Sequence, residues 1–134
     1  LFFNLWQPQI RKGHELFDCI VGFNIKRFDY KVLSGYTDYD FSRLPTLDIL
    51  EEVHNHLGYR LSLNHLANVT LGSQKSGDGL QALRWWKKGR IKKLLAYCKE
   101  DVHLTLDLFR YGCEQGYLLF TNKAGNMVRV PVNW

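Results

Sequence analysis

The sequence predicts one α/β domain over residues 1–134 that is rich in helix and ends in a β-hairpin, on three observations. Residues 18–24, DCIVGFN, form a continuous apolar run, which is typical of a strand buried on both faces. Apolar residues at helical spacing dominate the chain after this run. Residues 117–132, YLLFTNKAGNMVRVPV, have the pattern of two strands around the turn sequence KAGN, which predicts the hairpin.

Strand and helix are expected to alternate in the first half of the chain. Residues 9–17 have the pattern of a short helix. After the apolar strand, helical spacing predicts a helix that continues to Leu33, with Asn24 available as its N-cap. Residues 45–57 begin at a proline, start as a strand and continue as a helix that Gly58 ends.

Three helices are expected in the second half. Ser62 can cap the first, which Gly72 ends, and Asp78 can cap the second, which ends at Gly89. The third and longest helix covers about residues 90–112. Apolar stripes predict which faces the last two helices bury. The expected core residues are Leu80, Leu83 and Trp86 on the second helix, and Ile91, Leu94, Leu95, Cys98, Val102, Thr105 and Phe109 on the third.

The net charge of +5 is unevenly distributed along the chain. Residues 84–99, RWWKKGRIKKLLAYCK, contain seven basic side chains and no acidic one, whereas the remaining residues are slightly acidic. Such a segment can attract the phosphates of DNA or RNA, although a solvated, lysine-rich helix face has the same composition. The residues that we predict to bind nucleic acid are Arg84, Trp85, Lys87, Lys88, Arg90, Lys92 and Lys93.

The two tryptophans of this segment leave two interpretations open. Trp86 shares a stripe with Leu80 and Leu83, so it is expected in the core. Trp85 can then stack on a nucleic-acid base beside the basic residues, or it can pack beneath the β-hairpin.

The length of the apolar runs and the number of cysteines argue against several protein classes. No run of about 18 apolar residues occurs, so no membrane span is expected. The three cysteines are odd in number and lack C-x-x-C spacing, which argues against a disulfide framework or a zinc site. We therefore expect a cytoplasmic protein with reduced thiols.

Two short stretches contain residues that could support chemistry. Asn24, Phe28 and Asp29 directly follow the buried strand. Tyr97 and Asp101 are four residues apart on the longest helix, so their side chains project from one face beside its core stripe. A part-buried carboxylate there needs a partner, which can be a cation or simply a neighbouring backbone or basic group.

Together, Asn24-x-x-x-Phe28-Asp29 and Tyr97-x-x-x-Asp101 resemble the second and third motifs of the DEDDy 3'–5' exonucleases, within the ribonuclease H-like superfamily. Further stretches, among them KSGDGLQALRWWKKG and YCKEDVHLTLDLF, are similar in order to predicted exonuclease domains found beside helicases. The resemblance extends over about residues 16–134.

The resemblance implies a ribonuclease H-like fold and a site for two Mg²⁺ or Mn²⁺ ions among four acidic residues. Asp29 and Asp101 would be metal ligands, and Tyr97 would orient the attacking water. Three further residues would shape or support the site, namely Asn24, Phe28 and Asp48. The implied partner is nucleic acid, DNA or RNA, at a single-stranded segment or an end, and a helicase is a second implied partner.

The sequence departs from that family at the first motif, an Asp-x-Glu pair on the first strand. No such pair precedes Asn24, and Asn4 and Trp6 stand where the acids would be. We therefore expect residues 1–15 to be a divergent or replaced segment, the fold to be truncated at its N-terminal strands, and catalysis to be impaired. The alternative function is a non-catalytic module that binds nucleic acid or has a structural or assembly role. A sheet without its first strands exposes an edge, which residues 1–6 or a second copy in a homodimer could cover.

Overall fold

The computed structural model describes residues 4–6, 19–73 and 79–134. The helix expected over residues 9–17 and the cap expected at Asp78 lie outside the described residues. Elsewhere the chain forms a mixed α/β fold, rich in helix and ending in an antiparallel β-hairpin, as the sequence predicted.

A three-stranded sheet forms the first half of the domain. The strands β1 (Asn4–Trp6), β2 (Cys19–Gly22) and β3 (Thr46–Asp48) lie in the order β1-β2-β3. The central strand pairs antiparallel with β1 and parallel with β3, so both of its edges are hydrogen-bonded within this chain. Three of the four residues of β2 are buried, which confirms the predicted buried strand.

Two short helical segments connect β2 to β3, namely α1 (Asp29–Leu33) and the 3-10 helix η1 (Phe41–Arg43). The predicted helix boundary at Asn24 is wrong, because the helix begins only at Asp29. Asn24 instead has a left-handed backbone conformation, with a φ of 60°, which asparagine tolerates better than most residues. Its carbonyl accepts a hydrogen bond from the Phe28 N–H at 3.1 Å, so a turn separates the strand from the helix.

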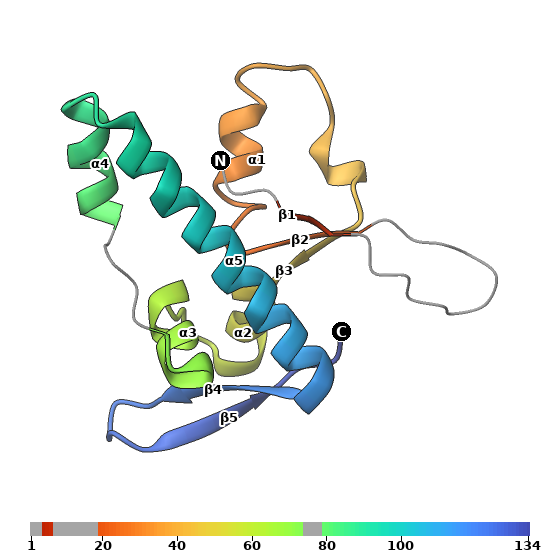
Figure 1. Ribbon diagram of the computed structural model, residues 1–134. Coiled ribbons are helices and arrows are strands. Elements are labelled where there is room, and N and C mark those ends of the chain that lie inside the picture. Colours follow the sequence, from red (N-terminus) through yellow and green to blue (C-terminus); the bar gives the residue numbers. More distant parts are fainter. Residues whose placement is uncertain (1–3, 7–18, 74–78) are drawn as a thin grey trace.

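Four helices and the hairpin complete the domain. These elements are α2 (Ile49–Leu57), α3 (Leu63–Leu71), α4 (Gly79–Lys87), α5 (Ile91–Gln115), β4 (Tyr117–Thr121) and β5 (Met127–Pro131). The predicted ends at Gly58 and Gly72 are confirmed, as is the Ser62 cap, whose hydroxyl accepts from the His65 N–H at 3.1 Å. Figure 1 shows α5 along the length of the domain, with α4 beside its first turns and the β4–β5 hairpin near its other end.

The main core lies where α5 meets β2, α3 and the β4–β5 hairpin. Its buried members come from each of these elements and from α2, and they include Val21, Ile49, Val53, Leu66, Leu108, Leu118, Phe120 and Val130. Burial of this apolar surface is the main force that holds the sheet, the helices and the hairpin together.

The predicted core stripe is wrong for α4 and for the first turns of α5. Leu80, Leu83 and Trp86 are exposed, and Ile91 and Leu95 on α5 are exposed as well. The less exposed side of α4 carries Ala82 and Trp85 instead. Apolar spacing identified a stripe but could not show that this stripe faces away from α5. The residues that α5 does bury are Tyr97, Asp101, Leu104, Thr105, Leu108, Phe109 and Gly112.

A second, smaller cluster lies between β2 and α1, around Ile20, Ile25 and Tyr30. The hydroxyl of Tyr30 lies 2.6 Å from Oγ1 of Thr46, which itself donates to the Leu44 carbonyl at 3.0 Å. Either hydroxyl can be the donor in the first bond, and the contact links α1 to β3.

The buried phenol predicts a loss of stability at alkaline pH. Burial raises the pKa of Tyr30 above its ordinary value of 10.0, although the hydrogen bond with Thr46 partly offsets this rise. The unfolded chain therefore releases this proton first, and the contribution of Tyr30 to stability declines as pH rises above about 10. Urea unfolding at pH values on both sides of 10.0, followed by circular dichroism, should show that Tyr30→Phe flattens the decline.

Tyr36→Phe is the matched control for this prediction, since Tyr36 is a largely exposed phenol in the same connection between β2 and β3. It should leave the dependence of unfolding free energy on pH unchanged. Identical pH curves for the two variants would contradict the assignment to Tyr30.

Two general expectations can be compared with the described residues. Cys19, Cys98 and Cys113 are all free thiols, so no disulfide joins them. None of the helices within the described part of the chain is long and apolar enough to cross a membrane.

Candidate functional site

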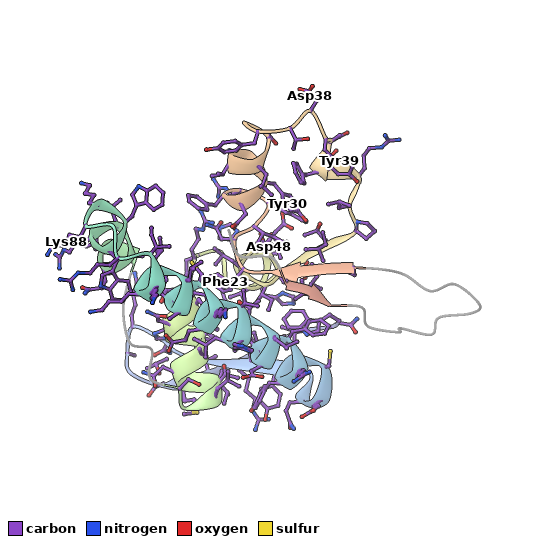
Figure 2. The ribbon with its side chains drawn as sticks, turned by 45° about the horizontal axis from the view of Figure 1, so that its top comes forward. Phe23, Tyr30, Asp38, Tyr39, Asp48 and Lys88 are labelled. Carbon is purple, nitrogen blue, oxygen red and sulfur yellow. The ribbon has the colours of Figure 1, made fainter. Side chains whose placement is uncertain are left out.

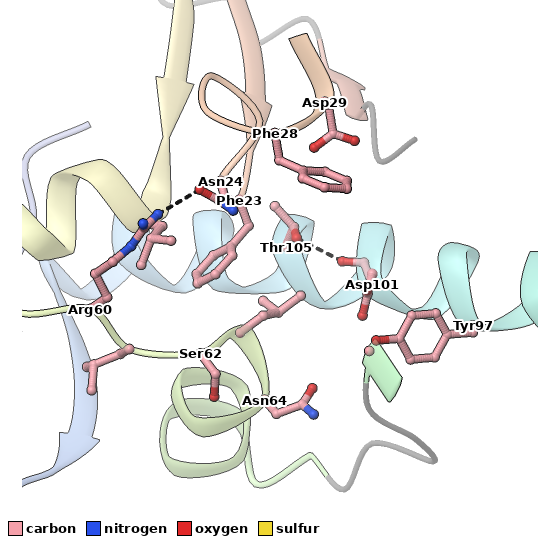
Figure 3. Close-up of a pocket in the computed structure, with 14 residues that line it drawn as sticks. Phe23, Asn24, Phe28, Asp29, Arg60, Ser62, Asn64, Tyr97, Asp101 and Thr105 are labelled. Carbon is pink, nitrogen blue, oxygen red and sulfur yellow. Dashed lines mark hydrogen bonds between the residues drawn. The ribbon is translucent and has the colours of Figure 1, made fainter. Parts of the chain in front are cut away.

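A cavity of about 660 Å³ lies between the loop that follows β2, the start of α3 and one face of α5 (Figure 3). Sequence-predicted site residues from two stretches of chain line it together. These residues are Asn24, Phe28, Asp29, Tyr97 and Asp101. The fold thus brings into one cavity the two stretches that the sequence singled out.

The loop side of the cavity depends on a close approach at the end of β2. A Cβ atom on Gly22 would lie 2.4 Å from the side chain of Ile25, which is fully buried. Glycine at this position therefore allows the chain to fold back on itself immediately after the strand. The turn that follows places Phe28 and Asp29 at the cavity, and Asp29 is only 1% exposed.

Asp48 stabilises this loop from outside the cavity. Its Oδ1 accepts from the Asn24 N–H at 2.8 Å and from the Leu50 N–H at 3.1 Å, and its Oδ2 accepts from the Lys26 N–H at 3.1 Å. The same carboxylate is the N-cap of α2. Asp48 therefore joins the loop after β2 to the helix after β3, and it is not among the described residues that line the cavity.

The salt bridge between Lys26 and Glu51 fastens the same loop to α2. The hydrogen bond with Glu51 is the main cause that raises the pKa of Lys26, and partial burial acts in the opposite direction. Both side chains remain well exposed to solvent, so this pair adds little to stability compared with the hydrogen bonds of Asp48.

The helix side of the cavity comes from successive turns of α5. Tyr97, Asp101 and Thr105 are four residues apart, so they lie above one another on one face. Asp101 is 9% exposed, and the Thr105 hydroxyl donates to its backbone carbonyl at 2.8 Å. Trp85 of α4 packs edge-on against Tyr97 at a centroid distance of 6.0 Å, which restricts the Tyr97 ring at the cavity.

Arg60 also lines the cavity, and sequence reasoning missed it. Its guanidinium Nη2 donates to Oδ1 of Asn24 at 2.7 Å, as Figure 3 shows. Arg60 lies in the short connection between α2 and α3, where no motif or periodicity marks it. Only the folded chain places this cation beside Asn24. Ser62 and Asn64, at the start of α3, contribute further polar groups.

The predicted nucleic-acid residues lie on α4 and the first turns of α5, which together form the α4–α5 hairpin, residues 79–95. All six basic residues in the set are exposed, whereas Trp85 is half-buried against Tyr97. In Figure 2, Lys88 lies at the end of this hairpin, away from Phe23 and Asp48. Gly79, the first residue of α4, lines the cavity, so the hairpin begins at the cavity wall.

Comparison with protein families gives a match that includes the cavity residues. A family model described as RNase H superfamily matches residues 4–112, which contain the sheet, the cavity and most of α5. The chain belongs to the RNase H superfamily. No curated protein and no solved structure matches the chain.

Nucleases of the RNase H superfamily typically use divalent metals, and the cavity contains part of what such ions require. The carboxylates of Asp29 and Asp101 are hard oxygen ligands of the kind that Mg²⁺ and Mn²⁺ prefer. However, residues 4–6, 19–73 and 79–134 contain no group of three or more His, Cys, Asp or Glu side chains placed to hold a metal. The described part of the chain therefore does not contain a two-ion centre.

Proposed function

We propose that this chain is a divergent 3'–5' exonuclease-type domain that binds nucleic acid and cleaves it poorly or not at all. The observation that carries the proposal is the cavity that joins Asn24, Phe28 and Asp29 to Tyr97 and Asp101. Membership of the RNase H superfamily supports a function on nucleic acid. The order and spacing of these residues support the DEDDy subtype.

In this proposal the cavity receives a strand end, and the surrounding cations hold its phosphates. Arg60, oriented by its hydrogen bond to Asn24, provides a cation at the loop side of the cavity. The α4–α5 hairpin adds six exposed basic side chains beyond Gly79. Phe23 and Phe28 give the cavity aromatic surface, which suits a nucleotide base.

Impaired cleavage follows from the number of carboxylates. A two-ion nuclease centre distributes its cations over several acidic ligands. The printed sequence provides Asp29 and Asp101 but no Asp-x-Glu pair before Asn24. We therefore expect these 134 residues, tested by themselves, to bind strands much better than they degrade them.

The experiment that tests this function uses fluorescence-labelled single strands of DNA and of RNA with the 134-residue chain. Fluorescence anisotropy measures binding, and gel electrophoresis after incubation with Mg²⁺ or Mn²⁺ measures shortening from the 3' end. Binding that weakens steeply with salt, with little shortening, is the expected result. Absence of binding to either kind of strand would refute the proposal, and rapid 3' shortening would refute its catalytic part.

The two cavity carboxylates predict a weak Mn²⁺ site. Asp29→Asn and Asp101→Asn should each weaken Mn²⁺ binding by at least about tenfold, because each removes one anionic ligand. Electron paramagnetic resonance of free Mn²⁺ measures this directly and requires no cleavage. Asp107→Asn is the matched control, since Asp107 lies on the exposed side of the same helix. Equal affinity in the wild type and all three variants would show that these carboxylates do not bind the metal.

A non-catalytic assembly role is the alternative function, and the missing acidic pair is the observation that favours it. A homodimer, an association with a helicase and a cytoplasmic location stay predictions from the sequence. Light scattering tests the first of these, and a monomeric mass would contradict it. In this chain β1 pairs with β2, so residues 4–6 cover an edge of β2 that a second copy could otherwise have covered.

A further inference from the structure

The outer surface of α4 has an unusual composition for an exposed helix face. Leu80 is 66% exposed, Leu83 is 49% exposed and Trp86 is 63% exposed. Large apolar side chains exposed together often mark a binding surface. Trp86 is the most informative of the three, because an exposed indole offers a flat face for stacking.

The two tryptophans near the end of α4 have different surroundings. The Gly89 N–H donates to the Trp86 carbonyl at 3.0 Å, and the Arg90 N–H donates to the Trp85 carbonyl at 2.8 Å. Gly89 has the left-handed φ of 66° that this Schellman turn requires. Neighbouring helical residues point about 100° apart. Trp85 therefore packs against Tyr97, while Trp86 projects to solvent.

Charge decides what kind of partner fits this face. The α4–α5 hairpin carries six exposed basic residues and no acidic residue. Two copies of such a surface repel each other, so the face does not suit a symmetric contact with a second copy. A polyanion with flat apolar groups matches both the charges and the exposed indole. Single-stranded nucleic acid has this chemistry, whereas a duplex keeps its bases stacked inside.

We propose that a single strand leaving the cavity crosses the α4–α5 hairpin and stacks an unpaired base on Trp86. This inference rests on the proposed function and names its preferred substrate as single-stranded. It also moves the stacking role that the sequence offered to Trp85 onto Trp86. The path is continuous, because α4 starts at Gly79 on the cavity wall and Trp86 lies in its last turn, among the basic residues.

The test compares two strands that carry the same phosphates. One is a labelled oligothymidine, and the other is an abasic strand of equal length, so the two differ only in their bases. Binding is measured by fluorescence anisotropy for the wild type, Trp86→Ala, Trp86→Phe and Leu80→Ala. Leu80→Ala is the matched control, because it shortens an equally exposed apolar side chain on the same helix without removing a ring.

Stacking makes a distinct set of results expected. Trp86→Ala should weaken binding of oligothymidine about tenfold, and Trp86→Phe should recover part of that loss. The abasic strand should bind the wild type weakly and be unaffected by Trp86→Ala. The salt dependence of binding should stay the same in all variants, because none of the substitutions changes a charge. A duplex of the same length should bind less tightly than the single strand.

The outcomes separate this inference from the proposed function. Equal binding of the thymidine and abasic strands, or no effect of Trp86→Ala on oligothymidine, would overturn the stacking role while strand binding stands. No binding of any strand would overturn the proposed function itself. Binding of an acidic amphipathic peptide that competes with the strand and depends equally on Leu80 and Trp86 would assign the face to a protein partner instead.

Discussion

Replacing Asp48 with alanine is expected to lower the free energy of unfolding by about 3 kcal/mol, the largest stability effect that we predict for a polar side chain here. The variant loses the N-cap of α2 and also the acceptor for the Asn24 and Lys26 N–H groups. Asp48 is only 2% exposed, so water cannot easily replace the missing acceptor. The loop that carries Asn24 and leads to Asp29 should loosen as a result.

Urea unfolding followed by circular dichroism measures this effect, and two variants provide controls. Asp48→Asn keeps an oxygen for the cap but replaces the other oxygen with an amide that cannot accept from Lys26, so its loss should be intermediate. Asp40 is the N-cap of the short, exposed helix η1, and its side chain accepts from the Ser42 N–H. Asp40→Ala therefore removes a cap that bridges no other element in the described part of the chain. If Asp48→Ala costs no more than Asp40→Ala, the bridging role of Asp48 is wrong.

Neutralising four lysines of the α4–α5 hairpin is expected to weaken binding of single strands by about two to three orders of magnitude near 0.1 M salt. The variant changes Lys87, Lys88, Lys92 and Lys93 to glutamine. Each phosphate contact that it removes lowers the slope of log affinity against log salt by about 0.7 for single strands. The slope should therefore become shallower by about 3, which separates lost phosphate contacts from a general loss of folding.

The control for this prediction changes four exposed basic residues outside the hairpin, namely Lys31, Arg43, Arg110 and Lys123. It lowers the net charge equally but leaves the α4–α5 hairpin intact. An equal fall in affinity in the hairpin variant and the control would indicate attraction by net charge alone. Unchanged binding in the hairpin variant would show that the α4–α5 hairpin does not bind the strand. The exposed lysines make few packing contacts, so both variants should unfold at the wild-type urea concentration.

Local sequence signals predicted most of the elements because backbone preferences decide them. Gly58 and Gly72 end helices in left-handed conformations, and Ser62 caps a helix with its hydroxyl, as their chemistry requires. The buried strand β2 was predictable because a strand covered on both faces needs apolar residues throughout. The cavity could be anticipated only through paired motifs, since spacing alone does not show that Asp29 and Asp101 line one cavity.

Tertiary contacts decided what the sequence could not. The stripe of Leu80, Leu83 and Trp86 has the periodicity of a core face, yet α4 packs on α5 through its other side. Arg60 reaches the cavity only because the connection between α2 and α3 passes beside Asn24. Asn24 is not the N-cap of a helix, because the chain turns back after Gly22 and α1 begins only at Asp29. In this turn Ile25 occupies the space that a side chain on residue 22 would need.

The long helix α5 contributes to both the cavity and the core, and this has a consequence for motion. Its middle and last turns bury Asp101, Leu104 and Leu108, so the cavity wall that carries Asp101 cannot shift without disturbing the core. Its first turn is exposed and lies against α4. The free energy of local opening should therefore be small at the hairpin end of α5, and at Asp101 it should approach that of global unfolding. A strand would meet an adaptable entrance that leads to a wall of fixed shape.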